Sequence, residues 1–346
     1  MKVEKKVIGT LNKCYSMANL DYKGKHCFLV AAEKQDPCYL FDEAGNKLET
    51  IWDGPGGVMT MQQVPGSDGQ FLATQKFYSP NDSANAYIAC VTPDQDGWKI
   101  EKLVDAPFVH RFGILERNGI NHLIVCTLKS DHEYKNDWRF PGAAYTAVLP
   151  KNLDKAKIEL KPLKTGLLKN HGFSVYEGKA VVGTENGTFL FTPPETADGQ
   201  WQIELLLAVP SSDSILLDLD GDGKPELGSI APFHGNSLTI YHLDEHGNYV
   251  PQWKYEKPES ETEMIHATWA GMLAGKPTWA VGWRKGSRNT ILITYDPDTQ
   301  TYQTQEIDTQ TGAANLMHFV NAAGQDVLVA TNREIDEIAM FTILPE

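Results

Sequence analysis

Short apolar segments recur along the whole chain, and turn-forming residues separate them. Residues 27–31, 123–126 and 327–330 are examples, each flanked by Gly, Asn, Asp or Pro. A run of this length between turn residues is typical of a β-strand, whereas long stretches with helical periodicity are nearly absent. The pattern therefore predicts an all-β protein.

The predicted strands group into a unit of four that is used repeatedly. In the third unit the strands are expected at 110–116, 121–127, 143–149 and 158–162, and in the fourth at 171–176, 179–183, 188–191 and 201–207. The first strands of the seven units start near Tyr15, Val58, His110, His171, Asp213, His266 and Asn315. These starts lie 42 to 61 residues apart, with a mean of 50. Four-stranded propeller blades need about 40–50 residues, so the spacing predicts a seven-bladed β-propeller.

The two ends of the chain complete this scheme. The last unit has three strands, the third at 338–343, while residues 6–11 form a strand without a unit. If that N-terminal strand supplies the missing fourth strand, the ring closes and an exposed sheet edge is removed. Residues 1–346 then form a single domain. A β-sandwich or two stacked β domains are the alternatives, but neither explains the incomplete last unit.

Composition and charge indicate which classes of binding partner are not expected. The chain is 41% hydrophobic and carries a formal charge of −14, from 31 basic and 45 acidic side chains. Because an acidic surface repels phosphates, nucleic acid is not expected as a partner. No apolar run is long enough to span a bilayer, so no membrane partner is expected either. The pattern specifies no oligomeric state.

The cysteines and the N-terminus bear on the compartment. The five cysteines are odd in number and lack CxxC spacing, which predicts reduced thiols in the core. Residues 1–6 carry positive charge, but no apolar segment of a secretory signal follows them. Both features favour a cytoplasmic protein.

Propeller topology predicts which residues meet in space. First strands start on one face of the disc, and the loops between second and third strands return to that face. Both sets should therefore surround one mouth of the channel. The first set contributes His110, His171, Asp213, His266, Tyr15 and Asn315. The second contributes Lys76, Tyr78, Lys129, His132, Glu185, Asn186, His234, Asn236, Arg284, Arg288, Asn332, Arg333 and Glu334.

Three histidines occupy equivalent positions of this repeat. Imidazole is the commonest ligand of divalent metals in proteins, and it titrates near neutral pH. His110, His171 and His266 are therefore predicted either to bind a divalent cation (zinc, magnesium or manganese) or to act in proton transfer. The alternative is that each histidine caps its own strand or lines a hydrated channel.

A second candidate metal site is local. In the sequence DLDGDGKPE at 218–226, Asp218, Asp220 and Asp222 alternate with glycines, as in the first half of an EF-hand calcium loop. The turn is expected on the opposite face from the histidines. It predicts either a structural calcium site or an Asp-Gly hairpin without a metal.

Several motifs resemble a known family. The stretches HGFSV at 171–175, LDLDGDGKPE at 217–226 and FHGN at 233–236, with the ending ATNREIDE at 330–337, resemble FG-GAP-type propellers. More narrowly, they are similar to the propeller domain of aldos-2-ulose dehydratases, which also act on 1,5-anhydro-fructose. This resemblance implies a metal-assisted site that removes water from a keto-sugar, with His110, His171 and His266 as ligands or acid and base. Enzymes of that family carry additional cupin-like domains.

These observations lead to a functional hypothesis of a carbon–oxygen lyase that acts on a small carbohydrate. A metal or an imidazolium would stabilise the enolate formed next to the sugar carbonyl, and a neutral histidine, lysine or tyrosine would accept the proton. Residues predicted to share the catalytic roles are Tyr78, Lys129, His132 and Arg284. Substrate contacts are predicted for Tyr15, Lys76, Trp138, His234, Asn236, Trp283, Arg288, Asn315, Asn332 and Arg333.

Two other functions fit the same pattern. The main alternative is a non-catalytic propeller that binds a glycan or a protein on its channel face, because propellers host many unrelated functions. A hydrolase with paired carboxylates is the third, with Asp213 and Glu185 as its acidic candidates.

Overall fold

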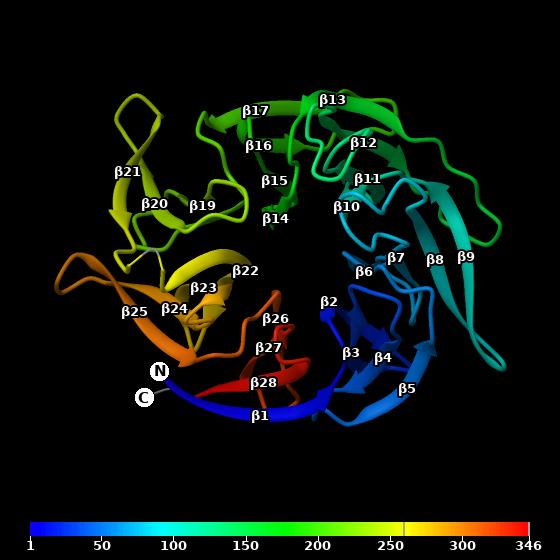
Figure 1. Cartoon of the computed structure of the whole chain (residues 1–346), viewed down its shortest axis with the longest axis horizontal. Helices are drawn as coiled ribbons and strands as arrows, with labels where there is room; N and C mark the ends of the chain where they lie inside the picture. The colour runs from blue at the N-terminus through cyan, green and yellow to red at the C-terminus, as the bar shows by residue number, and fades with distance from the viewer. Residues whose placement is uncertain (259, 345–346) are drawn as a thin grey trace.

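A computed structural model gives the architecture of the chain and describes residues 1–258 and 260–344. Their 28 strands form seven four-stranded antiparallel sheets arranged around one central axis (Figure 1). The described residues contain no helix. The fold is the predicted seven-bladed β-propeller.

Each blade runs from an inner strand at the channel to an outer strand at the rim. Blade one comprises β2 (Cys14–Tyr22), β3 (Lys25–Ala32), β4 (Cys38–Asp42) and β5 (Lys47–Trp52); blade two β6 (Met61–Gln63), β7 (Phe71–Gln75), β8 (Tyr87–Asp94) and β9 (Gly97–Asp105). Blade three comprises β10 (Val109–Arg117), β11 (Ile120–Thr127), β12 (Gly142–Val148) and β13 (Lys161–Leu167); blade four β14 (Gly172–Tyr176), β15 (Lys179–Thr184), β16 (Gly187–Thr192) and β17 (Gln202–Leu207). Blade five comprises β18 (Asp213–Leu217), β19 (Glu226–Ala231), β20 (Ser237–Leu243) and β21 (Tyr249–Lys254); blade six β22 (Thr262–Leu273), β23 (Lys276–Gly286), β24 (Thr290–Asp296) and β25 (Thr301–Asp308). Blade seven comprises β26 (Asn315–Val320), β27 (Asp326–Asn332), β28 (Glu337–Leu344) and the N-terminal β1 (Lys2–Thr10).

The ring closes as the sequence predicts. Strand β1 pairs antiparallel with β28, from Lys2 opposite Leu344 to Thr10 opposite Glu337, and forms the outer strand of blade seven (Figure 1). The first and last segments of the chain therefore share one sheet.

One predicted strand is wrong in its position. The fourth strand of the third unit was expected at 158–162, but β13 covers Lys161–Leu167. Ile158 and Leu160 pack instead against the core that blades two and three share. Apolar alternation predicted a strand there, but burial of the two side chains satisfies the same pattern without strand pairing.

The cores lie between neighbouring blades. Phe28 stacks on Phe41 in blade one and on Phe319 of blade seven, with ring centroids 5.3 and 5.7 Å apart. Between blades five and six, the Trp279 ring lies over Gly228, where an added Cβ would approach it to 2.8 Å. Such close contacts between sheets hold each inner strand at a fixed position beside the channel.

The five cysteines are free and buried, as the sequence predicts. Over the described residues, no helix has the length and hydropathy needed to cross a bilayer.

Candidate functional site

A repeated backbone feature turns three site residues toward the channel. The pairing register shifts at Tyr15 in β2, at His110 in β10 and at His266 in β22. Such a bulge re-aims the side chain of the extra residue and is common beside active sites. The residue two positions earlier in each case has a positive φ (Lys13 51°, Phe108 61° and Met264 56°). Blades one, three and six thus use the same local device to present a polar side chain.

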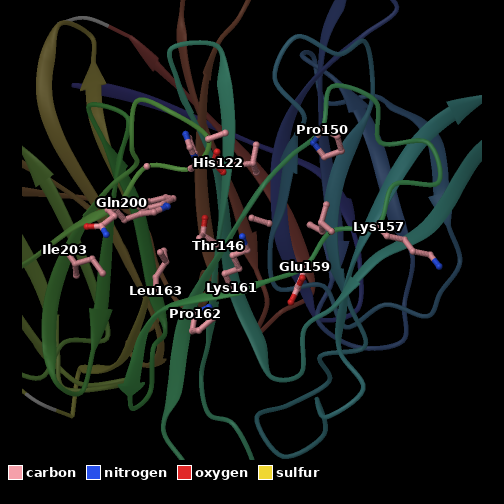
Figure 2. Close-up of a pocket in the computed structure, with 17 residues that line it drawn as sticks. His122, Thr146, Pro150, Lys157, Glu159, Lys161, Pro162, Leu163, Gln200 and Ile203 are labelled. Carbon is pink, nitrogen blue, oxygen red and sulfur yellow. The ribbon is translucent and has the colours of Figure 1, made fainter.

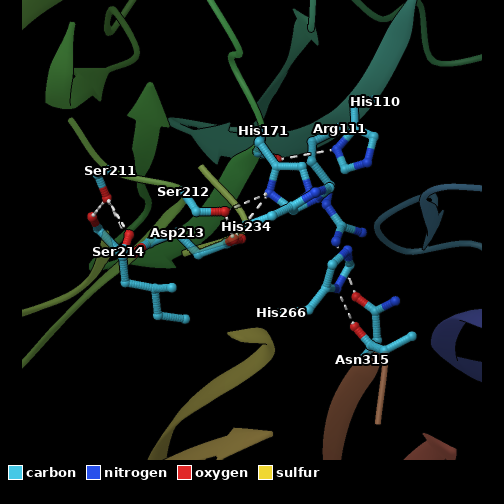
Figure 3. Close-up of polar contacts among 12 residues, drawn as sticks. His110, Arg111, His171, Ser211, Ser212, Asp213, Ser214, His234, His266 and Asn315 are labelled. Atoms are coloured by element: carbon cyan, nitrogen blue, oxygen red, sulfur yellow. Dashed lines mark hydrogen bonds and ion pairs between the residues drawn. The ribbon is translucent and has the colours of Figure 1, made fainter. Parts of the chain in front are cut away.

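Three histidines from blades four, five and six form a compact group of metal-type donors. The imidazole nitrogens of His171, His234 and His266 lie within 4.8 Å of one another (Figure 3). His171 precedes β14, His234 lies in the loop between β19 and β20, and His266 lies in β22. These three residues are called the histidine centre below.

Hydrogen bonds fix the tautomers of two members. The Nδ1–H of His171 donates to Asp213 Oδ2 at 2.9 Å, and the Nδ1–H of His266 donates to the carbonyl of Ala314 at 2.7 Å (Figure 3). In the neutral ring, which is the form that binds metal, the Nε2 atom therefore presents a lone pair. Anchoring of Nδ1–H by a carboxylate or a carbonyl is the usual outer-shell arrangement of a metal-binding histidine.

The spacing of the donors also fits a metal. His171 Nε2 and His234 Nε2 are 3.3 Å apart. Two ligands at the usual zinc–nitrogen distance with tetrahedral geometry lie about 3.3 Å apart. Without a cation, a proton must lie between these two nitrogens. The donor set thus suits zinc or a similar divalent ion.

Two close contacts hold the centre in place. Gly172 allows blade five to approach, because an added Cβ there would meet Ser212 O at 2.4 Å and Asp213 Cα at 2.5 Å. Ser212 Oγ donates to Asp213 Oδ2 at 2.9 Å, so the carboxylate accepts from both Ser212 and His171. His234 has a φ of 51°, a left-handed conformation that is costly for a residue other than glycine and that clusters at functional sites.

His110 lies beside the centre rather than in the donor group. Its ring stacks on His171 with centroids 4.3 Å apart, and its Nδ1–H donates to the carbonyl of His171 at 3.2 Å. Tyr15 Oη lies 3.5 Å from His110 Nε2 and 3.2 Å from His266 Nε2. One hydroxyl proton therefore stands between two imidazole acceptors.

The electrostatics keep the rings of His110, His234 and His266 neutral. Burial lowers the pKa of His110, His234 and His266 well below the ordinary value, and neighbouring positive charges lower it further. Burial opposes ionisation of Asp213, but the adjacent His171 and the hydrogen bonds outweigh it and lower the pKa of that carboxyl. Neutral imidazoles are the form that binds metal.

Arg111 and Asn315 complete the inner wall. The guanidinium of Arg111 donates to Asn315 Oδ1 at 3.0 Å and to the carbonyl of Met59 at 2.7 Å. Asn315 Nδ2 donates to the carbonyl of Tyr15 at 2.9 Å. Asn315 was predicted at the mouth, whereas Arg111 was missed, although it directly follows His110 in sequence.

Two predicted basic residues of the mouth form ion pairs. Arg284 is buried, and its Nη2 lies 2.7 Å from Glu334 Oε1. Arg333 pairs with both Glu33 and Glu334. Arg284 acts on the histidine centre through its charge, which contributes to the lowered pKa of His266.

The long loop of blade three contains three of the predicted site residues, Lys129, His132 and Trp138, and aromatic rings surround them. Lys129 is buried, its Nζ donates to the carbonyl of Asp137 at 2.6 Å, and it lies 4.5 Å from the ring centroid of Trp138. Trp138 contacts Phe233, which stacks on His234 with centroids 3.9 Å apart. His132, by contrast, packs against Phe108.

Of the remaining predicted residues, only Asn236 shares a hollow with a member of the histidine centre: it lines one of about 450 Å³ together with His234. Lys76 and Tyr78 line a separate hollow of about 570 Å³ in blade two. Trp283 is buried in the core of blades five and six. Asn332 is also buried, and it donates to Asp308 and Glu337. Arg288 is half-buried and makes no ion pair among the described residues. Trp283 and Asn332 therefore have structural surroundings instead of an open face.

The acidic loop, residues 218–226 between β18 and β19, brings its carboxylates together. Oxygens of Asp218, Asp220 and Asp222 lie within 4.8 Å of one another, and a second group joins Asp220 with Glu226 and His242. Glu226 is buried, and this raises the pKa of its carboxyl to about 7. The loop thus holds a closely spaced set of hard oxygen donors.

A larger hollow, of about 890 Å³, lies away from both sites (Figure 2). It is bounded by strands of blades three and four, including His122, Thr146, Leu163 and Ile203. None of the predicted site residues lines it. Its size alone therefore does not identify the functional site, and the donor geometry points to the channel.

Comparisons with known proteins support the fold. No protein-family model matches the chain, and no curated protein matches it. A solved structure described as "Streptogramin B lyase structure" is similar with a TM-score of 0.60 and 12% sequence identity, over 99% of this chain and 98% of that chain. At this identity the likeness shows the propeller alone. The narrower resemblance to FG-GAP-type propellers and aldos-2-ulose dehydratases has no counterpart in these comparisons.

Proposed function

We propose that this protein is a metal-dependent carbon–oxygen lyase that acts on a sugar at the histidine centre. The observation that carries the proposal is the convergence of His171, His234 and His266, with two of their Nδ1–H groups already anchored. A lyase exists on the same fold, as the similar solved structure is described, but fold alone does not set function. The argument therefore rests on the site.

Three neutral imidazoles would hold a divalent cation and leave a further position open for a ligand. A cation at such a site polarises a carbonyl or carboxyl oxygen and makes the adjacent C–H bond more acidic. In place of His110, the ligand set of this proposal contains His234, because the His234 nitrogen belongs to the donor group.

His110 and Tyr15 are suited to move the proton. Burial keeps His110 neutral, and its Nδ1–H is committed to the His171 carbonyl, so Nε2 is a free base that faces the Tyr15 hydroxyl. In the elimination, the base accepts a proton from carbon, and the C–H electron pair forms a C=C bond. The neighbouring C–O bond breaks, and the departing oxygen takes a proton from an acid such as the Tyr15 hydroxyl.

The test is reconstitution of the chelator-treated protein with zinc, manganese or magnesium, followed by an assay on 1,5-anhydro-fructose. We expect about one bound cation at the channel and an enone product that absorbs ultraviolet light. His234→Ala should lose both, whereas His122→Ala, which removes a buried histidine outside the site, should keep both. Unchanged metal binding in His234→Ala would refute the proposed ligand set.

A non-catalytic role is the competing outcome. Trp138 and Phe233 form an aromatic contact beside His234, and such surfaces bind sugar rings. Sugar binding that is independent of metal and never followed by elimination would favour the glycan-binding propeller.

The acidic loop is proposed as a separate structural site for calcium. Asp218, Asp220 and Asp222 offer the oxygen ligands that calcium prefers. Cation binding there would stabilise the blade without taking part in the reaction.

A further inference from the structure

Among the described residues, no carboxylate forms an ion pair with Arg111. Arg111 follows His110 in β10 and is half-buried. It donates to two neutral acceptors, the carbonyl of Met59 and the side-chain oxygen of Asn315. Within the described residues it makes no ion pair, although a partly buried cation normally has one.

The other cations near the histidine centre have partners. Arg284 pairs with Glu334 at 2.7 Å, and Lys169 pairs with Glu185 at 3.2 Å. Besides the histidines themselves, the cations whose charges act on this buried group are Arg111, Arg284 and Lys169. Only Arg111 among these three lacks a carboxylate.

Asp213 does not serve as the carboxylate partner of Arg111. Its Oδ2 accepts hydrogen bonds from His171 and Ser212, and it feels Arg111 only through space. With neutral histidines, Asp213 offsets one positive charge, and a divalent cation would add two. The loaded site would therefore carry a net positive charge of about two, before the distant ion pairs are counted.

The guanidinium is also held ready for a ligand. Its two hydrogen bonds fix the plane of the group, and its centre lies 5.8 Å from the centroid of the Tyr15 ring. A planar guanidinium with unused N–H donors matches the two oxygens of a carboxylate. Because its position is set before binding, little entropy is lost on contact.

We propose that the substrate of this site is a sugar carboxylate of the uronate type, whose carboxylate binds Arg111. The inference rests on the proposed lyase function and names its substrate class. In such a sugar the C–H bond next to the carboxylate is the acidic one. Its proton passes to the base, the electron pair forms a C=C bond, and the C–O bond one carbon further breaks. The products are an unsaturated carboxylate and water or an alcohol, and no oxidant is needed.

The experiment measures equilibrium binding rather than turnover. D-Glucuronate and D-glucose, which differ in a carboxylate against a hydroxymethyl group, are titrated into the metal-reconstituted and the metal-free protein by calorimetry. Glucose 6-phosphate is a third probe and distinguishes a carboxylate site from a general anion site. Variants are Arg111→Met and Arg111→Lys, with Arg117→Met as the matched control. Arg117 lies at the other end of β10 and pairs with Glu195.

We expect the unmodified protein to bind glucuronate about tenfold to a hundredfold more tightly than glucose, the range of a charge-assisted hydrogen-bond pair. Arg111→Met should abolish this preference, Arg111→Lys should retain part of it, and Arg117→Met should leave it unchanged. Equal binding of glucuronate and glucose, absence of binding by either sugar, or tighter binding of the phosphate would overturn the inference without recourse to any variant.

The two proposals fail in different ways. A preference for glucuronate without elimination in the presence of any metal would remove the lyase function and leave the carboxylate site. Elimination of a neutral keto-sugar, with no preference for glucuronate, would keep the lyase function and remove the uronate.

Discussion

Blade five carries a candidate metal site at each of its two ends, and the two are built differently. The histidine centre takes one residue from each of blades four, five and six, and its nitrogen donors are largely buried. The acidic loop takes its first three carboxylates from five consecutive residues, and these donors are partly or fully exposed. One site is thus a product of the whole ring, whereas the other is a product of one turn.

This difference predicts how each site responds to change. The donors of the histidine centre are held by contacts between blades, such as that of His171 with Asp213. Loss of one donor therefore disturbs the packing around it. The aspartates of the acidic loop accept hydrogen bonds from backbone N–H groups within the same turn, so their loss should remain local.

The largest expected contrast is in stability. His171→Ala leaves the buried Asp213 carboxylate without its imidazole partner, which should lower the free energy of unfolding by about 3–5 kcal/mol. Asp218→Ala at the exposed loop should cost less than about 1 kcal/mol in the absence of metal. Denaturant unfolding of the metal-free proteins measures both. Equal losses would show that the two sites do not differ in their coupling to the fold.

Zinc affinity should distinguish the ligands of the histidine centre from the neighbouring His110. His234→Ala removes a donor and should weaken zinc binding at the channel by at least about a hundredfold, a loss on the order of 3 kcal/mol. His110→Ala should change affinity less than about tenfold, because His110 lies outside the donor group. Competition with a zinc-sensitive dye provides the measurement. Similar losses in both variants would place His110 among the ligands after all.

The free energy of unfolding should depend on pH with opposite signs at the two sites. His110, His234 and His266 have pKa values below those of the unfolded chain, so acidification below about pH 6.5 protonates the unfolded state first. Each of these histidines then lowers stability by up to about 1.4 kcal/mol for each pH unit.

Glu226 acts in the other direction. Its pKa is raised to about 7 in the folded protein, so the metal-free fold loses stability as pH rises from about 4.5 to 7. Glu226→Gln should remove that part of the pH profile and leave the histidine part in place. Unfolding free energies at pH 5, 6, 7 and 8 in the presence of chelator test both signs. A difference in unfolding free energy between the two proteins that stays constant from pH 5 to pH 7 would contradict the assignment to Glu226.

Calcium binding should have the smallest effect on the free energy of unfolding. At ten times its Kd, an ion bound only by the folded state adds about 1.4 kcal/mol to the free energy of unfolding. Asp220→Asn should abolish this gain, and His234→Ala should preserve it. A thermal or chemical unfolding series with and without calcium measures the effect, and a gain that depends on His234 would mean that calcium binds at the channel.

The fold was accessible from sequence because its signal is repeated. The spare N-terminal strand and the three-stranded last unit predicted the β1–β28 pairing that the structure contains. The error at 158–162 arose because Ile158 and Leu160 bury their side chains against a core without joining a ladder. Alternation of apolar residues reports burial, and strand pairing is only one way to achieve it.

The site was accessible in part. Topology placed His171, His234 and His266 at one mouth, but the alignment of the blades predicted His110 as a metal ligand and His234 only as a substrate contact. The choice of His234 follows from distance, because one of its nitrogens lies within 4.8 Å of donor nitrogens of His171 and His266, whereas His110 stacks on His171 outside that group. Lys13, Phe108 and Met264, which set up the bulges, carry no glycine-like signal in the sequence.

By itself, the sequence determined the number of blades, the closure of the ring and the chemistry of the acidic loop, because each depends on repeated or neighbouring residues. The tertiary structure alone decided which imidazoles share a centre, which nitrogen of each ring is free, and that Arg111 has no counter-ion among the described residues. These properties depend on distances of a few ångströms between blades, and packing sets those distances among residues that lie about 30 to 200 positions apart.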